Sequence, residues 1–327
     1  MIGCKLVRKV KGLLKRAKMP EFLHHFGPKW YPLWMHFLCL LVKQACKLSY
    51  RRVCRFLRDL GFDVPTYSAL CKFLKRLTQQ QLELLLKATV GFEKTVVAAV
   101  DGMYFSQVNP SFAYLKRVKR GFPRKNTQTV GFYDTCRKKW LAASTRRKNI
   151  GEYKLAEEAY LKIAVTIAIV VADKGFDINQ FYRLLKRHGI RGIIPVKKGV
   201  HRGFFRNLMR KYYRTRTYHR RSIIEAGVSR LKRLYGGFLY SRNAYQQRKE
   251  VLLRMIADNL NFLRRQFSSQ NQTTFNKAVL TGGLMELPCK ACGFTRPPNL
   301  WVARLSVKNR LPLVPGTIMQ AALAGGS

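Results

Sequence analysis

Two apolar runs in the chain each end at an aspartate. Thr95–Val100 is rich in β-branched residues and alanine and is followed by Asp101. Ile163–Ala172 is aliphatic apart from Thr166 and is followed by Asp173. Continuous apolar runs are typical of strands that are buried on both faces of a sheet, with helices covering those faces. The chain is therefore expected to fold as an α/β protein, in which ligands bind at the carboxyl ends of such strands.

The spacing of apolar residues predicts further elements around these two strands. More strands are expected at Phe112–Val118, Gln128–Tyr133 and Gly192–Val196, with Trp140–Ser144 extending the second of them. The expected helices are Glu152–Leu161, Ile178–His188 with Asp177 as its N-cap, 217–235 and 249–265, and residues 197–216 form a basic loop. The order of three strands, helix, strand, helix, strand and helix predicts a mixed sheet flanked by helices.

The N-terminal part has a different pattern. Residues 1–29 read as a basic arm, and residues 31–80 as helices. A segment ending at Leu60 is stopped by Gly61, and a second one follows over Tyr67–Leu77, so the pair resembles a helix-turn-helix. An ordinary helical bundle with a solvated basic face is the alternative. The residues expected to contact DNA from this pair are Arg51, Arg52, Arg55, Lys72, Lys75 and Arg76.

Charge indicates the partner. The chain has 63 Lys and Arg against 16 Asp and Glu, a formal net charge of +47, with 47% hydrophobic residues to supply a core. Self-repulsion at this charge opposes compact folding unless a polyanion offsets it, and nucleic acid is the polyanion that such a surface binds. Composition alone leaves a ribosomal-type RNA-binding protein or a membrane-surface protein as alternatives. No segment is long enough to span a membrane, and the pattern predicts a cytoplasmic protein with reduced thiols, associated with DNA.

Three carboxylates stand out because the chain has so few. Asp101 and Asp173 follow buried strands, and Glu225 lies in an apolar step of a helix. Lone charges in such places are costly, but the cost disappears if the three groups converge on Mg²⁺ or Mn²⁺. Two such ions can activate the attacking oxygen and stabilise the leaving oxygen of a phosphodiester. Each residue alone also has a structural explanation: Asp-Gly is common in turns, and Arg221 can pair with Glu225 four residues later.

The helix that carries Glu225 presents several functional groups. Tyr218, Arg221, Glu225 and Lys232 fall within an arc of roughly 60° on an ideal α-helix. The carboxylate could hold metal while Arg221 and Lys232 bind flanking phosphates. A merely solvated basic face needs no such alignment.

These residues resemble a known family. Tyr-x2-Arg-x3-Glu-x6-Lys, formed by the four residues just named, is similar to the signature of insertion-sequence transposases of the DDE type. Ala172-Asp-Lys-Gly-Phe-Asp177 resembles the family's second-Asp motif, with Phe176 where Tyr is usual, and Val100-Asp101-Gly102 resembles the first. Met103 stands where many members have Thr or Ser. The resemblance covers about residues 95–265 and implies a ribonuclease-H-like fold, two Mg²⁺ ions, and hydrolysis followed by strand transfer at transposon ends.

The sequence therefore predicts a DNA transposase in three parts: a basic arm and helical DNA-binding region (1–92), a ribonuclease-H-like catalytic domain (93–265) and a loosely ordered tail (266–327). Asp101, Asp173 and Glu225 are the expected catalytic residues and metal ligands, and a homodimer is expected on DNA, with neither a membrane nor a small-molecule substrate as partner. The alternatives are another ribonuclease-H-like nuclease or a nucleic-acid-binding protein without catalysis. Cys289 and Cys292 have zinc-ligand spacing but make only half a site.

Overall fold

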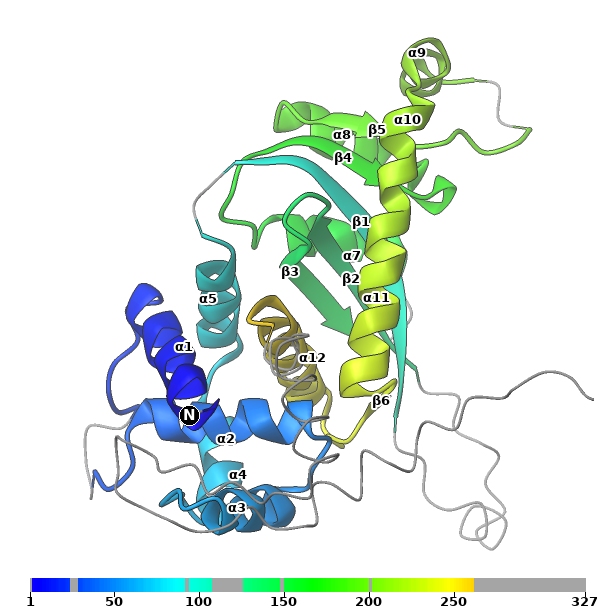
Figure 1. Ribbon diagram of the computed structural model, residues 1–327. Coiled ribbons are helices and arrows are strands. Elements are labelled where there is room, and N and C mark those ends of the chain that lie inside the picture. The colour runs from blue at the N-terminus through cyan, green and yellow to red at the C-terminus, as the bar shows by residue number, and fades with distance from the viewer. Residues whose placement is uncertain are drawn as a thin grey trace, which may run out of the picture. The chain divides into compact units, whose positions relative to one another are not determined.

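The expected strands form one mixed sheet in the computed structural model, which describes residues 2–23, 29–91, 94–107, 126–147, 150–199 and 202–261. Its strands are β1 (Thr95–Gln107), β2 (Asn126–Asp134), β3 (Lys139–Arg146), β4 (Ile167–Ala172), β5 (Arg191–Ile193) and β6 (Phe238–Leu239). The order is β3-β2-β1-β4-β5, with β6 beside the far end of β1. The first three strands are antiparallel, whereas β4 and β5 run parallel to β1 (Figure 1). The predicted mixed sheet is thus confirmed.

Helices bury both faces of this sheet. Alternate residues of a strand point to opposite faces, and in β1 Ala98 and Val100 belong to one core cluster while Val97 and Ala99 belong to another. The helices of the first cluster are α7 (Glu152–Tyr160), α8 (Asn179–Arg187) and part of α9 (Phe204–Tyr212). Those of the second are α11 (Ser222–Tyr235) and α12 (Ala244–Asn259).

The N-terminal region is entirely helical, as predicted. Its helices are α1 (Ile2–Arg16), α2 (Leu33–Ala45), α3 (Tyr50–Asp59), α4 (Tyr67–Arg76) and α5 (Gln79–Val90). Side chains of Ser49 and Thr66 cap α3 and α4 by accepting from backbone N–H groups, and Thr78 forms a capping box with Gln81 at the start of α5. Gly61 follows α3 with φ +81°, a conformation that favours glycine.

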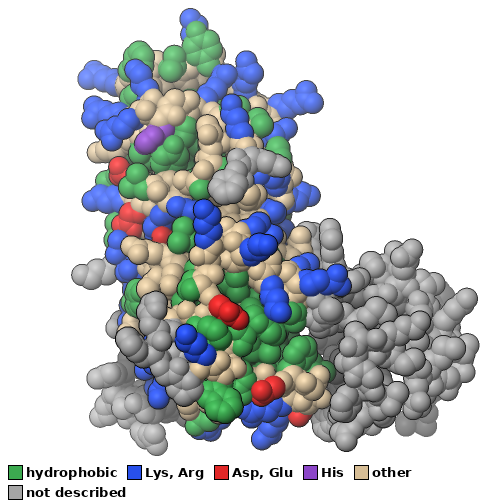
Figure 2. Space-filling model, turned by 90° about the vertical axis from the view of Figure 1, so that its left-hand side faces the viewer, with side chains coloured by type: hydrophobic (Ala, Val, Ile, Leu, Met, Phe, Trp, Pro, Cys, Tyr) green, Lys and Arg blue, Asp and Glu red, His purple; other side chains and the backbone are tan. Residues whose placement is uncertain are grey.

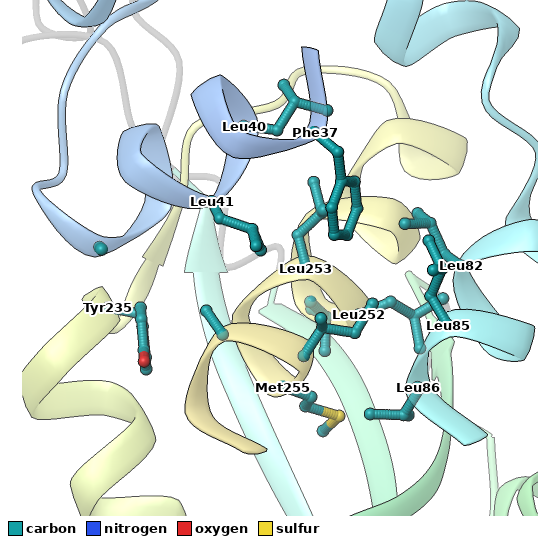
Figure 3. Packing of buried hydrophobic residues seen from close by; sticks show 14 of the residues in the cluster. Phe37, Leu40, Leu41, Leu82, Leu85, Leu86, Tyr235, Leu252, Leu253 and Met255 are labelled. Carbon is teal, nitrogen blue, oxygen red and sulfur yellow. The ribbon is translucent and has the colours of Figure 1, made fainter. Parts of the chain in front are cut away.

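One core joins this helical region to the sheet. Figure 3 shows α12 between them, with Leu252 and Leu253 beside Phe37 of α2 and Leu85 of α5. The ammonium group of Lys249, fully buried in α12, donates to the last carbonyls of α4, at 2.8 Å and 3.1 Å. The change from helices to strands near residue 92 is therefore not a break in the core, and all described residues lie in one compact unit, Ile2–Phe267.

Several local expectations were wrong. The basic arm contains α1, an amphipathic helix that buries Val10 and Leu13. Trp140–Ser144 belongs to a separate strand, β3, because the chain turns after β2 and pairs with it. The basic loop 197–216 contains α9 and the start of α10 (Thr215–Tyr218). The proposed strand Phe112–Val118 lies outside the described residues.

The ends of α8 also differ from expectation. Ile178 precedes the helix without a side-chain cap, whereas the carboxylate of Asp177 accepts from the Lys197 N–H at 3.0 Å and pairs with Arg206. Asp177 therefore ties the start of α8 to the segment leading into α9. None of the described helices combines the length and the apolar content that a membrane crossing needs.

Candidate active site

Strand register brings Asp101 and Asp173 to neighbouring positions. Val100 of β1 is opposite Ala172 of β4, and the two aspartates are the next residues on these parallel strands. Adjacent strands lie about 4.8 Å apart. The expectation that β1 ends at Asp101 was wrong: β4 stops at Ala172, but β1 continues to Gln107 because β2 remains paired with it. Asp101 is therefore in the middle of a long strand, at the point where its parallel neighbour ends.

Arg221 and Glu225 approach the aspartates from the connection before α11. A 3-10 turn, η2 (His219–Arg221), follows α10 and packs against both β1 and β4. Tyr218, Arg221 and Glu225 thus do not share one continuous α-helix, which corrects the sequence-based arc. The two side chains, four residues apart, still contact each other: Arg221 Nη2 donates to Glu225 Oε1 at 2.5 Å.

The charges around Arg221 define the centre of the site. Burial alone would lower the pKa of its guanidinium, but the Tyr218 hydroxyl and the negative charges of Glu225, Asp173 and Asp101 together raise it. All three predicted carboxylates therefore act on one cation. Its distance from the Tyr218 ring centroid is 6.0 Å, within the range of a cation–π contact.

Asp101 is the most perturbed of these carboxyl groups. Burial raises its pKa to about 6, the charges of Glu225 and Glu152 add to the rise, and Arg221 and the Gly102 N–H oppose it. The Gly102 N–H donates to Asp101 Oδ1 at 2.9 Å. A cation brought close to this half-buried carboxyl would favour its ionised form and so lower its pKa again.

Glu152 is a fourth carboxylate that sequence reasoning missed. It is the first residue of α7, and a Cβ atom on Gly102 would collide with its Oε1. Its Oε2 would lie 3.8 Å from a Cβ on Gly175, so the group lies between the segments that follow Asp101 and Asp173. Tyr104 donates its hydroxyl to Glu152 Oε1 at 3.3 Å. The signal in the sequence was weak, since a Glu at the start of a helix usually only stabilises the helix dipole.

The donor set suits a hard divalent ion, although the carboxylates are not yet gathered into one cluster. Within the described part of the chain, no group of three or more His, Cys, Asp or Glu side chains is close enough to hold a metal. Glu225 is paired with Arg221 instead. Carboxylate oxygens on separate elements around the half-buried Asp101 are the ligands that Mg²⁺ and Mn²⁺ prefer, provided that Glu225 exchanges its arginine for metal.

The family match agrees with this geometry. Residues 119–260 match the family model described as Transposase DDE domain. Over this segment, which is less than half of the chain, the protein is similar to transposase DDE domains. The segment contains Asp173, Arg221 and Glu225, whereas Asp101 lies before the matched residues.

Comparisons beyond the DDE domain are weaker. A chain in the cryo-EM structure of the simian T-cell lymphotropic virus intasome in complex with PP2A regulatory subunit B56 gamma is 12% identical, with a TM-score of 0.29. The alignment covers 72% of this chain and 62% of that one, so this chain spans less than two thirds of its length. A chain in the crystal structure of a pre-cleavage Mos1 transpososome is 9% identical, with a TM-score of 0.18 and coverage of 75% and 82%. No curated protein matches the chain.

The remaining predicted residues lie apart from the carboxylates. Lys232 is two turns beyond Glu225 on α11, about 10 Å along the axis, with its ammonium 6.0 Å from the centroid of the Phe105 ring. The six basic residues predicted on the helix pair are all exposed: Arg51, Arg52 and Arg55 on α3, and Lys72, Lys75 and Arg76 on α4. Cys289 and Cys292 fall outside the described residues.

Proposed function

We propose that this protein is a DNA transposase that cleaves transposon ends and joins them to target DNA, with Asp101, Asp173 and Glu225 as its catalytic carboxylates. The observation that carries the proposal is the arrangement of the three carboxylates: β1–β4 pairing makes Asp101 and Asp173 neighbours, and the turn that packs on both strands carries Arg221, which pairs with Glu225. A structural ion pair would need only one of these carboxylates. Oxygen donors from a strand, a strand end and a helix are what a phosphodiester-cleaving metal site requires.

The residues divide the work as follows. Asp101, Asp173 and Glu225 would hold two Mg²⁺ or Mn²⁺ ions, the number that the family resemblance implies. The bound metal would supply an activated oxygen nucleophile and stabilise the leaving oxygen. Arg221 releases Glu225 and turns to a DNA phosphate, which offers the same planar, bidentate partner. Tyr218 and Lys232 flank it and bind the backbone on either side.

DNA is the proposed partner of the helical region as well. The exposed arginines and lysines of α3 and α4 contact the transposon end, and the net charge of +47 supplies affinity without sequence preference. The protein is accordingly expected to be associated with DNA in the cytoplasm. Cutting both ends of an element calls for two sites, so a homodimer that forms on DNA completes the proposal.

A cleavage assay tests the proposal with the full chain. The substrate is a linear duplex that carries the inverted repeats flanking the reading frame, incubated with Mg²⁺ or Mn²⁺. Asp101→Asn, Asp173→Asn and Glu225→Gln should each abolish cleavage at the repeat and joining to a second duplex. Glu157→Gln is the matched control, because Glu157 is exposed on α7.

The alternatives give distinct results in the same assay. Cleavage of branched or hybrid substrates in preference to repeat ends would identify another ribonuclease-H-like nuclease. Tight binding of the repeat duplex with no cleavage in any divalent metal would identify a binding protein without catalysis. Light scattering with and without repeat DNA tests the dimer, and a complex of one chain per DNA that still joins paired ends would refute it.

A further inference from the structure

A groove between α8 and α9 carries aromatic side chains that the fold does not need. It encloses about 550 Å³ and is lined by Tyr182 and Lys186 of α8, Arg191 of β5, and Phe204, Leu208 and Tyr212 of α9. The last three follow one another at intervals of four residues, so they lie along one side of the helix. Phe204 is 67% exposed and Tyr212 is 51% exposed.

The adjacent side of α9, which also lines the groove, supplies the packing of this helix. Phe205 stacks on Tyr182 with ring centroids 5.5 Å apart and an interplanar angle of 6°, and Met209 is buried in the core cluster with α8. Phe204 and Tyr212 therefore remain largely exposed although α9 is already packed against α8. Large exposed rings gathered in one groove indicate a binding surface.

Cations surround the exposed rings. No Asp or Glu occurs between Asp177 and Glu225, a stretch that contains both helices. The Lys186 ammonium is 5.8 Å from the Phe204 ring centroid, and the Lys211 ammonium is 5.6 Å from that of Tyr212. At the top of Figure 2, which is the end of the molecule where α9 lies, hydrophobic side chains appear among Lys and Arg.

Aromatic faces combined with a basic groove match one ligand chemistry. The bases of a duplex are stacked on one another, so only unpaired nucleotides offer a free base to a protein ring while their phosphates meet Lys and Arg. An apolar protein surface would bury the Lys and Arg side chains without a charged partner, which costs free energy. An acidic peptide would pair with these cations but would offer the aromatic rings nothing to stack on. We propose that the α8–α9 groove binds single-stranded DNA, with bases stacked on Phe204 and Tyr212 and phosphates bound by Lys186, Arg191 and Lys211.

The helix α9 that lines the groove is linked along the chain to the candidate active site. The chain runs from α9 through α10 into η2, and the rings of Tyr213 and Tyr218 lie 5.6 Å apart within this connection. The choice of DNA over RNA rests on the proposed function, because an enzyme that cuts duplex ends generates unpaired strands beside its carboxylates. A strand released at Arg221 would then have a place to bind on the adjoining element.

Fluorescence anisotropy with the full chain tests this inference. The probes are an oligothymidylate of about 12 nucleotides and a blunt duplex of equal length, titrated at one fixed salt concentration. Phe204→Ala and Tyr212→Ala should each weaken binding of the oligothymidylate roughly 5-fold or more, while the affinity for the duplex changes little. Phe204→Trp and Tyr212→Phe keep the rings and should restore binding.

The controls separate this inference from the proposed function. Tyr240→Ala removes an exposed ring elsewhere and should leave oligothymidylate binding unchanged. Equal affinity of Phe204→Ala, Tyr212→Ala and Tyr240→Ala for the oligothymidylate would overturn the inference, as would a polyglutamate peptide that binds with the same dependence on the two rings. Failure of the unaltered protein to cleave repeat DNA would refute the proposed function but leave this binding measurement intact.

Discussion

Two arginine–glutamate pairs with the same four-residue separation lie on neighbouring helices and differ in their surroundings. Glu250 and Arg254 of α12 are 1% and 0% exposed, and Arg254 also donates to the carbonyls of Gly236 and Phe238 at 2.6 Å. Arg221 and Glu225 are 21% and 51% exposed at the candidate active site. The first pair is held by backbone on all sides, whereas the second faces other carboxylates and solvent.

The difference teaches which pair can change partners. A buried pair cannot separate without leaving an uncompensated charge in the core. A half-exposed pair contributes little to stability, since solvent screens it, and it can open when a phosphate or a metal competes. An Arg–Glu pair with a four-residue separation therefore stabilises the core at α12. The pair with the same separation before α11 can exchange its partners.

The largest effect is expected at the exchangeable pair. Glu225→Gln should reduce the cleavage rate roughly 10⁴-fold, because the amide is a poor metal ligand and the metal stabilises the transition state. Its unfolding free energy should stay within about 0.5 kcal/mol of that of the unaltered protein. Cleavage kinetics and urea unfolding on the same preparation check both halves. If Glu225→Gln were destabilised but still cleaved DNA, Glu225 would have a structural role like that of Glu250. Its assignment as a metal ligand would then be wrong.

The buried pair should show the reverse pattern. Glu250→Ala leaves Arg254 without its partner and should cost about 3–5 kcal/mol of unfolding free energy. Urea unfolding measures this loss, with Glu225→Ala as the matched control on the exposed pair. If the variant remains folded at low temperature, its cleavage rate should be close to normal. A stability loss below that of Glu225→Ala would contradict the stabilising role of the buried pair.

Glu152 is expected to have an intermediate effect. Because its carboxylate lies between the segments after Asp101 and Asp173, Glu152→Gln should lower cleavage about 10- to 100-fold, the range typical of groups that support a metal site. Glu157→Gln on the same helix is the control. Titration with Mn²⁺ provides a second readout, since the variant should need more metal for half-maximal cleavage. Equal activity of the two variants would return Glu152 to a helix-capping role.

Lys232 should give the smallest change. Lys232→Ala should weaken binding of repeat DNA and lower the slope of log affinity against log salt by about one unit, because one phosphate contact is lost. Arg233→Gln, at an exposed position next to it, is the comparison. Identical slopes for Lys232→Ala and the unaltered protein would show that the ammonium near Phe105 does not reach DNA.

The sequence was informative where the signal is local. Apolar runs ending at Asp101 and Asp173 predicted two strands, and parallel pairing then required the aspartates to be neighbours. The sequence was uninformative where local structure depends on contacts with residues far away in the chain. The 3-10 turn at Arg221 interrupts a pattern that reads as one helix, since η2 has to pack against β1 and β4. The sequence did not indicate a role for Glu152, because its carboxylate is brought next to Gly102, fifty residues earlier, only by the folding of the chain.

α9 was missed for a related reason. Its apolar residues occupy two sides, one packed on α8 and one exposed, so a basic segment with scattered aromatics shows no single apolar face. The prediction of an arm over 1–29 failed for another reason: Leu6, Val10 and Leu13 of α1 do recur at helical spacing, but the Lys and Arg residues among them read as a charged arm. Periodicity identifies a helix best when it has one buried side.

The position of α12 has a consequence for synthesis of the protein. Lys249 of α12 and the Leu74 carbonyl that it binds are 175 residues apart. The apolar sides of α2 and α5 also pack against α12. At translation rates of about 5–20 residues per second, the first helices wait roughly 10–35 s for that partner to leave the ribosome. During this interval their leucines are open to chaperones and to other nascent chains. A transcript that is cut short before residue 244 would yield helices with no partner, so truncated products are expected to be degraded rather than to compete with the full chain for DNA.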